Sequence, residues 1–185
     1  MVTVDEAAGL WKVLRPVREE HLSFLEDLRR PENCAPYNWE GYRAAQDLRQ
    51  RLDRDGFLGP DGGSLVVTLP DGTPVGCVSW HGVHHGMPPA SRCWNIGITI
   101  APHHRGRGLG TEAQRLLAAY LLATTTVNRI EADTDVTNLA EQRSLEKAGF
   151  TREGTMRGAQ FREGAWHDLV LFSRLRDDRA PEPTA

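Results

Sequence analysis

The chain has 185 residues, of which 39% are hydrophobic and 25% charged, and its formal net charge is −3. That length and apolar content suffice for one domain with a buried core. The charge balance excludes the strongly basic surface typical of proteins that bind nucleic acid or anionic membranes. We expect a single domain over residues 1–175 and a disordered polar tail over residues 176–185.

No apolar stretch approaches the roughly 20 residues of a membrane span. The first residues, MVTVDEAAGLWKVL, lack the basic start and apolar core of a secretory signal. These features predict a cytoplasmic protein. The cysteines Cys34, Cys77 and Cys93 are odd in number and far apart, which predicts reduced, structural thiols.

The first part of the chain predicts one strand and two helices. An apolar run at residues 10–14 indicates the strand, and residues 16–29 carry leucines and a phenylalanine on one side of a helix. Two prolines within residues 31–36 break this helix. A second helix is predicted to end near Leu52, where glycines follow.

A hairpin and a buried strand come next. The strands at residues 65–69 and 75–83 are joined by the turn Pro-Asp-Gly-Thr at residues 70–73. Residues 95–101 form a short run rich in isoleucine, which is typical of a strand buried on both faces. This strand is predicted to lie at the centre of the sheet.

A glycine-rich loop, RGRGLG at residues 105–110, follows the central strand and precedes a helix. Glycines at alternate positions remove Cβ atoms where a backbone must approach a ligand closely. The free N–H groups and dipole of the helix N-terminus favour an anion. With two arginines in the loop, the sequence predicts a phosphate or pyrophosphate ligand.

The residues around the loop narrow the choice of ligand. A P-loop requires Lys-Ser/Thr after its last glycine, and a dinucleotide fingerprint requires a third glycine, but this chain has Thr111 and Glu112 there. The pattern that fits is Gln/Arg-x-x-Gly-x-Gly/Ala, with Arg105, Gly108 and Gly110. It resembles the acetyl-coenzyme A loop of the GNAT N-acetyltransferases.

The last part of the chain predicts a strand, a helix and a strand pair. Residues 129–135, RIEADTD, alternate apolar and polar positions, and Asn138 begins a helix that Gly149 ends. Residues 150–175 predict two strands around a turn at residues 162–165. The element order favours an α/β fold, with a mixed sheet covered by helices on both faces.

Two further stretches extend the resemblance. Residues 138–150, NLAEQRSLEKAGF, are similar to a helix of the ribosomal-protein alanine acetyltransferase (RimJ/RimL) branch of the GNAT superfamily. Residues 164–172 resemble that branch's last strand, and residues 14–16 its first. The resemblance implies a GNAT fold with about seven strands, mostly antiparallel and splayed at two central parallel strands, and about four helices.

The resemblance also implies acetyl-CoA, or another acyl-CoA, as co-substrate and no metal. Backbone atoms of Ile98, Thr99 and Ile100 would pair with the pantetheine arm, and Asn138 would reach the pantetheine or thioester. Backbone N–H groups of the loop would hold the pyrophosphate, at Arg105, Gly106, Arg107, Gly108, Leu109, Gly110 and Thr111.

In this family a primary amine attacks the thioester directly in a ternary complex, and a backbone N–H of the central strand stabilises the oxyanion. One group must also deprotonate the ammonium, and another must protonate the thiolate. Many relatives carry Glu where this chain has Asn95, and Ser where it has Glu141. The amide of Asn95 cannot act as a base, and Ser144 lies one position further round the helix.

Four residues are candidates for proton transfer, each with a structural alternative. Glu131 and Asp133 could accept a proton through water, or form a solvated or salt-bridged strand face. Glu141 could donate a proton if burial raised its pKa, or close a capping box with Asn138. His81 could titrate in a useful range, or be structural.

The histidine pairs at residues 84–85 and 103–104 do not predict a metal site, because adjacent strand residues point apart and no carboxylate stands at ligand spacing. Four aromatic residues could line an acceptor pocket that is apolar yet wet. Two of them, Trp80 and Trp94, could equally pack in the core. The other two, Trp39 and Tyr42, lie between the first two helices, where this family builds its acceptor site.

The sequence therefore predicts an N-acetyltransferase that acts on a protein N-terminal amine or on a small-molecule amine, such as an antibiotic or amino sugar. An acidic surface at residues 131–135 would favour a polycationic aminoglycoside. An alternative from another class is a non-catalytic acyl-CoA-binding sensor, favoured by the loss of the usual Glu and Ser. Monomer and homodimer both remain open.

Overall fold

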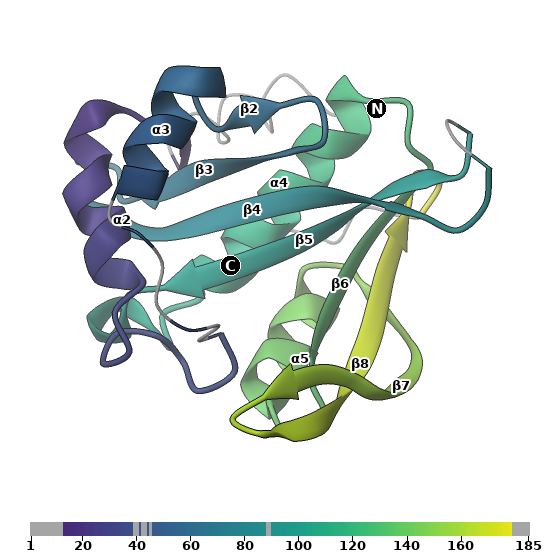
Figure 1. Ribbon diagram of the computed structural model, residues 1–185. Helices are drawn as coiled ribbons and strands as arrows, with labels where there is room; N and C mark the ends of the chain where they lie inside the picture. Colours follow the sequence, from purple (N-terminus) through teal and green to yellow (C-terminus); the bar gives the residue numbers. More distant parts are fainter. Residues whose placement is uncertain (1–12, 39–40, 42–43, 45, 88–89, 179–185) are drawn as a thin grey trace.

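The computed structural model describes residues 13–38, 41, 44, 46–87 and 90–178. Their strands form one eight-stranded sheet, ordered β1-β3-β4-β5-β6-β8-β7, with β2 paired to β3 (Figure 1). The strands are β1 (Leu14–Pro16), β2 (Leu58–Gly59), β3 (Gly62–Thr68), β4 (Pro74–His84), β5 (Arg92–Ile100), β6 (Arg129–Asp135), β7 (Thr151–Arg162) and β8 (Ala165–Leu175).

Only the central pair, β5 and β6, is parallel, and every other pairing is antiparallel. The predicted mixed, mostly antiparallel sheet is confirmed. One strand more than expected is present because the two-residue strand β2 carries no sequence pattern of its own.

The two central strands separate soon after they meet. Their register consists of Trp94 opposite Ile130 and Asn95 opposite Glu131, whereas β5 stays paired with β4 as far as Ile100. Beyond Asn95, the edge of β5 that faces β6 therefore has no strand partner among the described residues, and Figure 1 shows the two strands diverging. The predicted splay is confirmed, and it leaves backbone N–H and C=O groups available at the middle of the sheet.

Helices cover both faces of the sheet (Figure 1). The helical segments are η1 (Glu19–His21), α2 (Leu22–Leu28), α3 (Gln46–Asp55), η2 (Pro102–His104), α4 (Leu109–Thr124) and α5 (Leu139–Lys147). The larger core packs α4 and α5 against side chains such as Trp94, Ile96 and Ile130. A second core joins α2 and α3 to the opposite face through Leu25, Leu48, Phe57 and others.

Because successive strand residues point to opposite faces, β5 serves both sides of the sheet. Trp94 and Ile96 enter the larger core. The alternate positions Asn95, Gly97 and Thr99 therefore face the side on which α2 and α3 lie. One face of β5 thus packs in the larger core, and its other face lies toward α2 and α3.

Some element boundaries differ from the sequence prediction. In the described part of the chain the first strand covers Leu14–Pro16, and residues 10–12 of the predicted strand are not among the described residues. Pro16 fits there because β1 is an edge strand that needs no N–H from this position. The helix predicted over residues 16–29 is consequently shorter, with η1 leading into α2. Helix α4 begins at Leu109, two residues before its predicted start.

At the C-terminus, Arg176 donates hydrogen bonds to the carbonyls of Leu122, Thr125 and Val127. The rest of the predicted tail, residues 179–185, lies outside the described residues. No helix among the described residues combines the length and apolar character needed to cross a membrane.

Candidate active site

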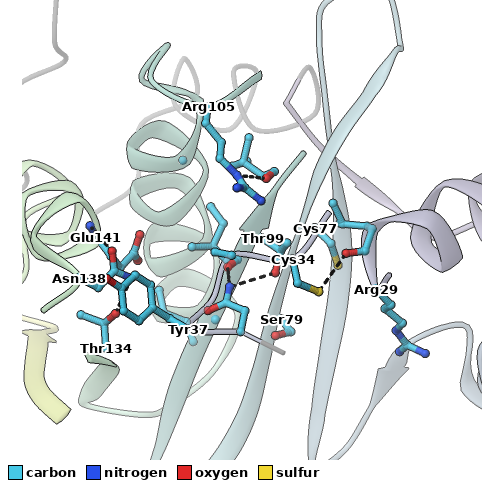
Figure 2. Close-up of a pocket in the computed structure, with 18 of the residues that line it drawn as sticks. Arg29, Cys34, Tyr37, Cys77, Ser79, Thr99, Arg105, Thr134, Asn138 and Glu141 are labelled. Atoms are coloured by element: carbon cyan, nitrogen blue, oxygen red, sulfur yellow. Dashed lines mark hydrogen bonds between the residues drawn. The ribbon is translucent and has the colours of Figure 1, made fainter. Parts of the chain in front are cut away.

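A cavity of about 920 Å³ occupies the region where β5 and β6 separate. One part is lined by the end of β5, the glycine loop and the start of α5. The other part lies between the sheet and the segment that carries α2 and α3. Figure 2 shows Thr134, Asn138 and Glu141 on one side of this cavity, and Cys77 and Arg29 on the other.

The glycine loop has the conformation that its sequence predicts. Gly106 and Gly108 have φ values of 73° and 78°, in the left-handed region that favours glycine. Gly108 is the N-cap of α4, and a Cβ built on either glycine would meet no protein atom within 4 Å. The loop therefore leaves open space beside a helix N-terminus, as a phosphate site requires.

Arg105 joins this loop to two other elements. Its Nε donates to the carbonyl of Ile100 at 2.8 Å (Figure 2), and its Nη2 donates to the carbonyl of Asn33 at 2.6 Å. The side chain thus ties the end of β5 to the segment after α2. Arg107 is exposed and is not among the residues that line the cavity.

The other predicted coenzyme-binding residues all line the cavity: Ile98, Thr99, Ile100, Gly106, Gly108, Leu109, Gly110, Thr111 and Asn138. On the open edge of β5, the carbonyl of Ile98 accepts a hydrogen bond of 3.1 Å from Asn38 Nδ2. A second, longer contact of 3.4 Å joins the same amide to Thr99 Oγ1. The α2–α3 segment thus reaches the edge at which a pantetheine arm was expected.

Asn138 has the predicted position at the start of α5. Its Oδ1 accepts from the backbone N–H of Glu141 at 3.4 Å, and its Nδ2 donates to Thr134 Oγ1 at 3.0 Å. The other half of the capping box is not formed, because the Glu141 carboxylate accepts a hydrogen bond from Gln114 Nε2 instead. Burial raises the pKa of Glu141, and the bond from Gln114 opposes this shift.

Ser144 also lines the cavity, although its sequence position suggested otherwise. Its Oγ lies 2.9 Å from Thr111 Oγ1 and donates to Gln114 Oε1 at 3.0 Å. Together with Glu141, these side chains form one polar cluster that links α4 to α5. Ser144 lies three residues after Glu141 on α5. Residues three apart in a helix are neighbours, so both side chains lie on the same face.

Asp133 presents an exposed carboxylate on the cavity wall. Its Oδ2 accepts a hydrogen bond of 2.6 Å from Asn95 Nδ2. Asn95 therefore orients a carboxylate from the neighbouring strand.

The other acidic side chains of β6 have internal partners. Glu131 is 3% exposed, accepts from Arg129 Nε at 2.5 Å, lies 2.6 Å from His85 Nε2 and does not line the cavity. Asp135 is bonded to Arg162 Nη2 at 2.7 Å. Burial alone would raise the pKa of Asp135, but hydrogen bonds from Thr137 and Arg162 outweigh it and lower that pKa to about 2. We therefore leave Glu131 out of the proposed catalytic groups.

His85, Cys93 and Glu131 place their potential ligand atoms within 4.8 Å of one another. No carboxylate stands at ligand spacing from these histidines in the sequence, but the fold brings Glu131 beside His85 from a strand 46 residues away. Arg129, which also binds Glu153 at 2.6 Å, already neutralises Glu131. We propose no metal here.

Three other predicted residues lie away from the cavity lining. Trp80 and Trp94 are buried in the larger core, where even-numbered positions of β4 and β5 point. His81 is exposed opposite Asn95 in the register of β4 and β5. We assign these residues no acceptor or catalytic role. Trp39 and Tyr42 fall outside the described residues.

Sequence reasoning missed several residues that line the cavity. From the segment after α2 come Cys34, Tyr37 and Asn38, and from the sheet floor come Cys77 and Ser79 (Figure 2). Tyr37 OH lies 3.4 Å from Thr137 Oγ1. The available signal was the break at residues 31–36, which marks a loop next to the predicted acceptor region.

The chain is similar in sequence to known acetyltransferases. Residues 13–151 match the model of a family described as an acetyltransferase (GNAT) domain. The chain is 30% identical over 163 residues to the probable N-acetyltransferase YjcK of Bacillus subtilis, covering 88% of this chain and 86% of that relative. It is 21% identical to the ribosomal-protein-serine acetyltransferase of Escherichia coli, covering 77% of this chain and 78% of the other.

Among solved structures, the fold is similar to spermidine N-acetyltransferase from Vibrio cholerae in complex with CoA and spermine. The TM-score is 0.76 at 20% identity, over 89% of this chain and 95% of that one. At this identity the likeness shows the fold alone.

Proposed function

Because this chain belongs to the acetyltransferase (GNAT) family, we propose that it transfers an acetyl group from acetyl-CoA to a primary amine. The single observation that carries this proposal is the cavity between the parted strands β5 and β6, which combines an open strand edge with a glycine loop at a helix N-terminus. Such a site can hold a coenzyme with a diphosphate at one end and an extended amide chain at the other.

The residues present fit this coenzyme. Gly106 and Gly108 leave open space at the loop, so the backbone N–H groups of residues 105–111 would hold the pyrophosphate. The backbone of Ile98 to Ile100 would pair with the pantetheine arm, and Asn138 would contact it from α5. When bound, the coenzyme supplies an activated acetyl group that an uncharged amine attacks directly.

Asp133 is the group that we propose as general base. It is the carboxylate of β6 that faces the cavity without an ion pair among the described residues, and Asn95 orients it. A base must lie within direct or one-water reach of the amine proton. Asp133 would take this proton on a carboxylate oxygen and release it to water.

Glu141 is the group that we propose as general acid. Its half-buried carboxyl lines the coenzyme side of the cavity, and desolvation raises its pKa, which favours the protonated form. A protonated carboxyl at this position would give its proton to the departing sulfur. The neighbouring Ser144 and Gln114 hold it in place through a chain of hydrogen bonds.

An assay of thiol release tests the proposed function. Purified protein is mixed with acetyl-CoA and each of several primary amines, and free thiol is measured with and without the amine. We expect amine-dependent release together with heat of CoA binding in calorimetry. Binding without release from any amine would instead support an acyl-CoA sensor, and absence of binding by a folded protein would refute both.

A further inference from the structure

Three arginines, Arg29, Arg30 and Arg51, line the part of the cavity that lies under α2 and α3, and Arg30 is paired with Asp27. Arg29 follows the end of α2, and Arg51 lies on α3. Figure 2 shows Arg29 on the other side of β4 from Glu141. Burial raises the pKa of Cys77, on the cavity floor, to about 11, and the positive charges of Arg29 and Arg51 both oppose this shift. Both guanidinium groups therefore act on the same part of the cavity.

Arg51 has an unusual environment for a charged side chain. Its guanidinium lies 4.7 Å from the centroid of the Phe57 ring, and burial lowers its pKa. Neighbouring arginines have carboxylate partners, with Arg29 bound to Asp47 at 3.3 Å and Arg54 to Asp55 at 3.0 Å. Within the described ranges of the chain, Arg51 forms no ion pair. A partly desolvated guanidinium held against an aromatic ring is well suited to bind a carboxylate.

The support of Arg51 comes at a conformational cost. Phe57 is 2% exposed and has a φ of 64°, a left-handed conformation that is strained for a residue other than glycine. Its backbone N–H is fixed by Asp55 Oδ1 at 2.9 Å. This strained turn places the ring against the guanidinium. Strain of this kind is typical of positions that hold a binding group in place.

The acidic strand expected to attract a polycation does not supply the charge for it. Glu131 is buried against Arg129, and Asp135 is paired with Arg162. Of the carboxylates on β6, only Asp133 faces the cavity without an ion pair to a described residue. Near the parting of β5 and β6 the cavity thus offers the carboxylate of Asp133. Under α2 and α3 its lining carries three arginines and one carboxylate, Glu26, so this end has an excess of positive charge.

We propose that Arg51, assisted by Arg29, binds a carboxylate of the acceptor, so that the acetylated amine belongs to an acidic molecule. This inference rests on the proposed function and names its substrate class. A linear polyamine has no carboxylate that Arg51 could bind, and its positive charges would repel the guanidinium. The structure therefore assigns this chain a preference opposite to that for spermidine.

The floor of the cavity indicates the length of the acceptor. Ser64, Ser79 and Gly97 lie opposite one another in the registers of β3, β4 and β5. Two strand spacings amount to about 10 Å, which corresponds to about three residues of extended peptide. Phe57, whose carbonyl accepts from Ser64 N, marks the β3 end next to Arg51. The carboxylate should thus stand two or three residues, or an equivalent chain, from the amine.

The test compares matched acceptors in the thiol-release assay. One arm uses alanyl peptides with glutamate or glutamine at the second and third positions, and the other uses 4-aminobutyrate and its amide. Spermidine is included as the polycation. We expect kcat/KM to be at least about tenfold higher for the carboxylate member of a pair, because a site built for a polar group rejects the analogue that lacks it. The two arms show whether an acidic peptide or a small amino acid is preferred.

Three variants test whether Arg51 is responsible for the preference for carboxylate acceptors. Arg51→Gln should abolish the discrimination by raising KM for the carboxylate acceptor, with KM for acetyl-CoA unchanged, and Arg51→Lys should retain part of it. Arg54→Gln, on the same helix and outside the cavity lining, is the matched control and should behave like the wild type.

Equal kcat/KM within both pairs, a preference for spermidine, or discrimination that persists in Arg51→Gln would overturn this inference while leaving the acetyltransferase proposal intact. No thiol release with any amine would overturn both.

Discussion

The side-chain amide of Asn95 donates a hydrogen bond of 2.6 Å to Oδ2 of Asp133, across the point where β5 and β6 begin to part. An amide cannot remove a proton, but it can fix the direction of a carboxylate that does. In this pair, Asn95 on β5 would orient the carboxylate and Asp133 on β6 would accept the proton.

We predict that Asp133→Asn lowers kcat by about 100-fold or more, since general base catalysis contributes on that order. Asn95→Ala should lower kcat by only about tenfold, because the base remains but is less well oriented. Steady-state rates at saturating acetyl-CoA measure both effects. Full activity of the folded Asp133→Asn protein would show that the base lies elsewhere.

Glu141→Gln should change how stability depends on pH. The pKa of Glu141 is raised in the folded protein above its ordinary value of 4.5, so the folded state binds more protons and wild-type stability falls as pH rises above that value. The stability of the Glu141→Gln variant should not show this fall with rising pH, because glutamine does not titrate. Urea unfolding at about pH 5 and about pH 8 should show the variant gaining relative to wild type at the higher pH. Parallel curves for the two proteins would contradict a raised pKa.

The same variant should lower kcat with little effect on KM for the acceptor, because the proton donor acts after the amine has bound. Loss of a general acid costs on the order of 100-fold. The comparison of kcat with KM in the thiol-release assay measures this separately from stability. An unchanged kcat would mean that another group, or water, protonates the sulfur.

Gly108→Ala and Gly110→Ala form a matched pair for the coenzyme loop. Gly108 has a φ of 78°, so an alanine there costs about 1–2 kcal/mol and displaces the loop amides. A Cβ on Gly110 would make ordinary contacts of 3.7 Å with Ile98 and Ile100. Calorimetry should give a dissociation constant for CoA about tenfold or more higher for Gly108→Ala, and near wild type for Gly110→Ala. Equal binding by both variants would remove the loop from the coenzyme site.

Asp135→Asn should destabilise the protein by about 3–5 kcal/mol, because it leaves the buried Arg162 without its counter-charge. The pKa of Asp135 is lowered to about 2, so its stabilising contribution is present above its ordinary value of 3.8 and is lost as pH falls through about 2. Chemical denaturation at neutral pH measures the first effect, and acid titration of the wild type the second. Asp133→Asn, on the same strand but exposed, is the control and should cost less than about 0.5 kcal/mol.

The sequence, read together with its family resemblance, was sufficient to predict the sheet class, the parted central strands and a glycine loop at a helix N-terminus. The strands and the loop depend on local signals: isoleucine-rich runs for the strands, and glycines with left-handed backbone for the loop. The role of Asn138 as a helix cap was also local. Hydrophobic periodicity and turn chemistry gave the positions of the strands, the loop and the helices. The parting of the central strands and the coenzyme were expected from the resemblance to the GNAT N-acetyltransferases.

The acceptor side could not be predicted in the same way, since its contacts join distant segments. Arg29 and Arg51 line the same cavity as Ser64 and Ser79, which come from strands later in the chain. Alternating acidic residues on β6 gave no sign that Arg162 would neutralise Asp135 from another strand. Nor does a helical position reveal that Arg51 rests against the ring of Phe57, because the backbone strain at Phe57 arises from tertiary packing.

The two-sided character of β5 has a consequence for engineering. The residues proposed to contact the coenzyme come mainly from the strand edge, the loop and α5, whereas the residues proposed to contact the acceptor come from α2 and α3. Grafting residues 29–51 of a relative onto this scaffold should therefore transfer selectivity while the donor half keeps its affinity. Related enzymes could therefore diverge in acceptor selectivity by substitutions within residues 29–51, while the sheet beneath this segment stays unchanged.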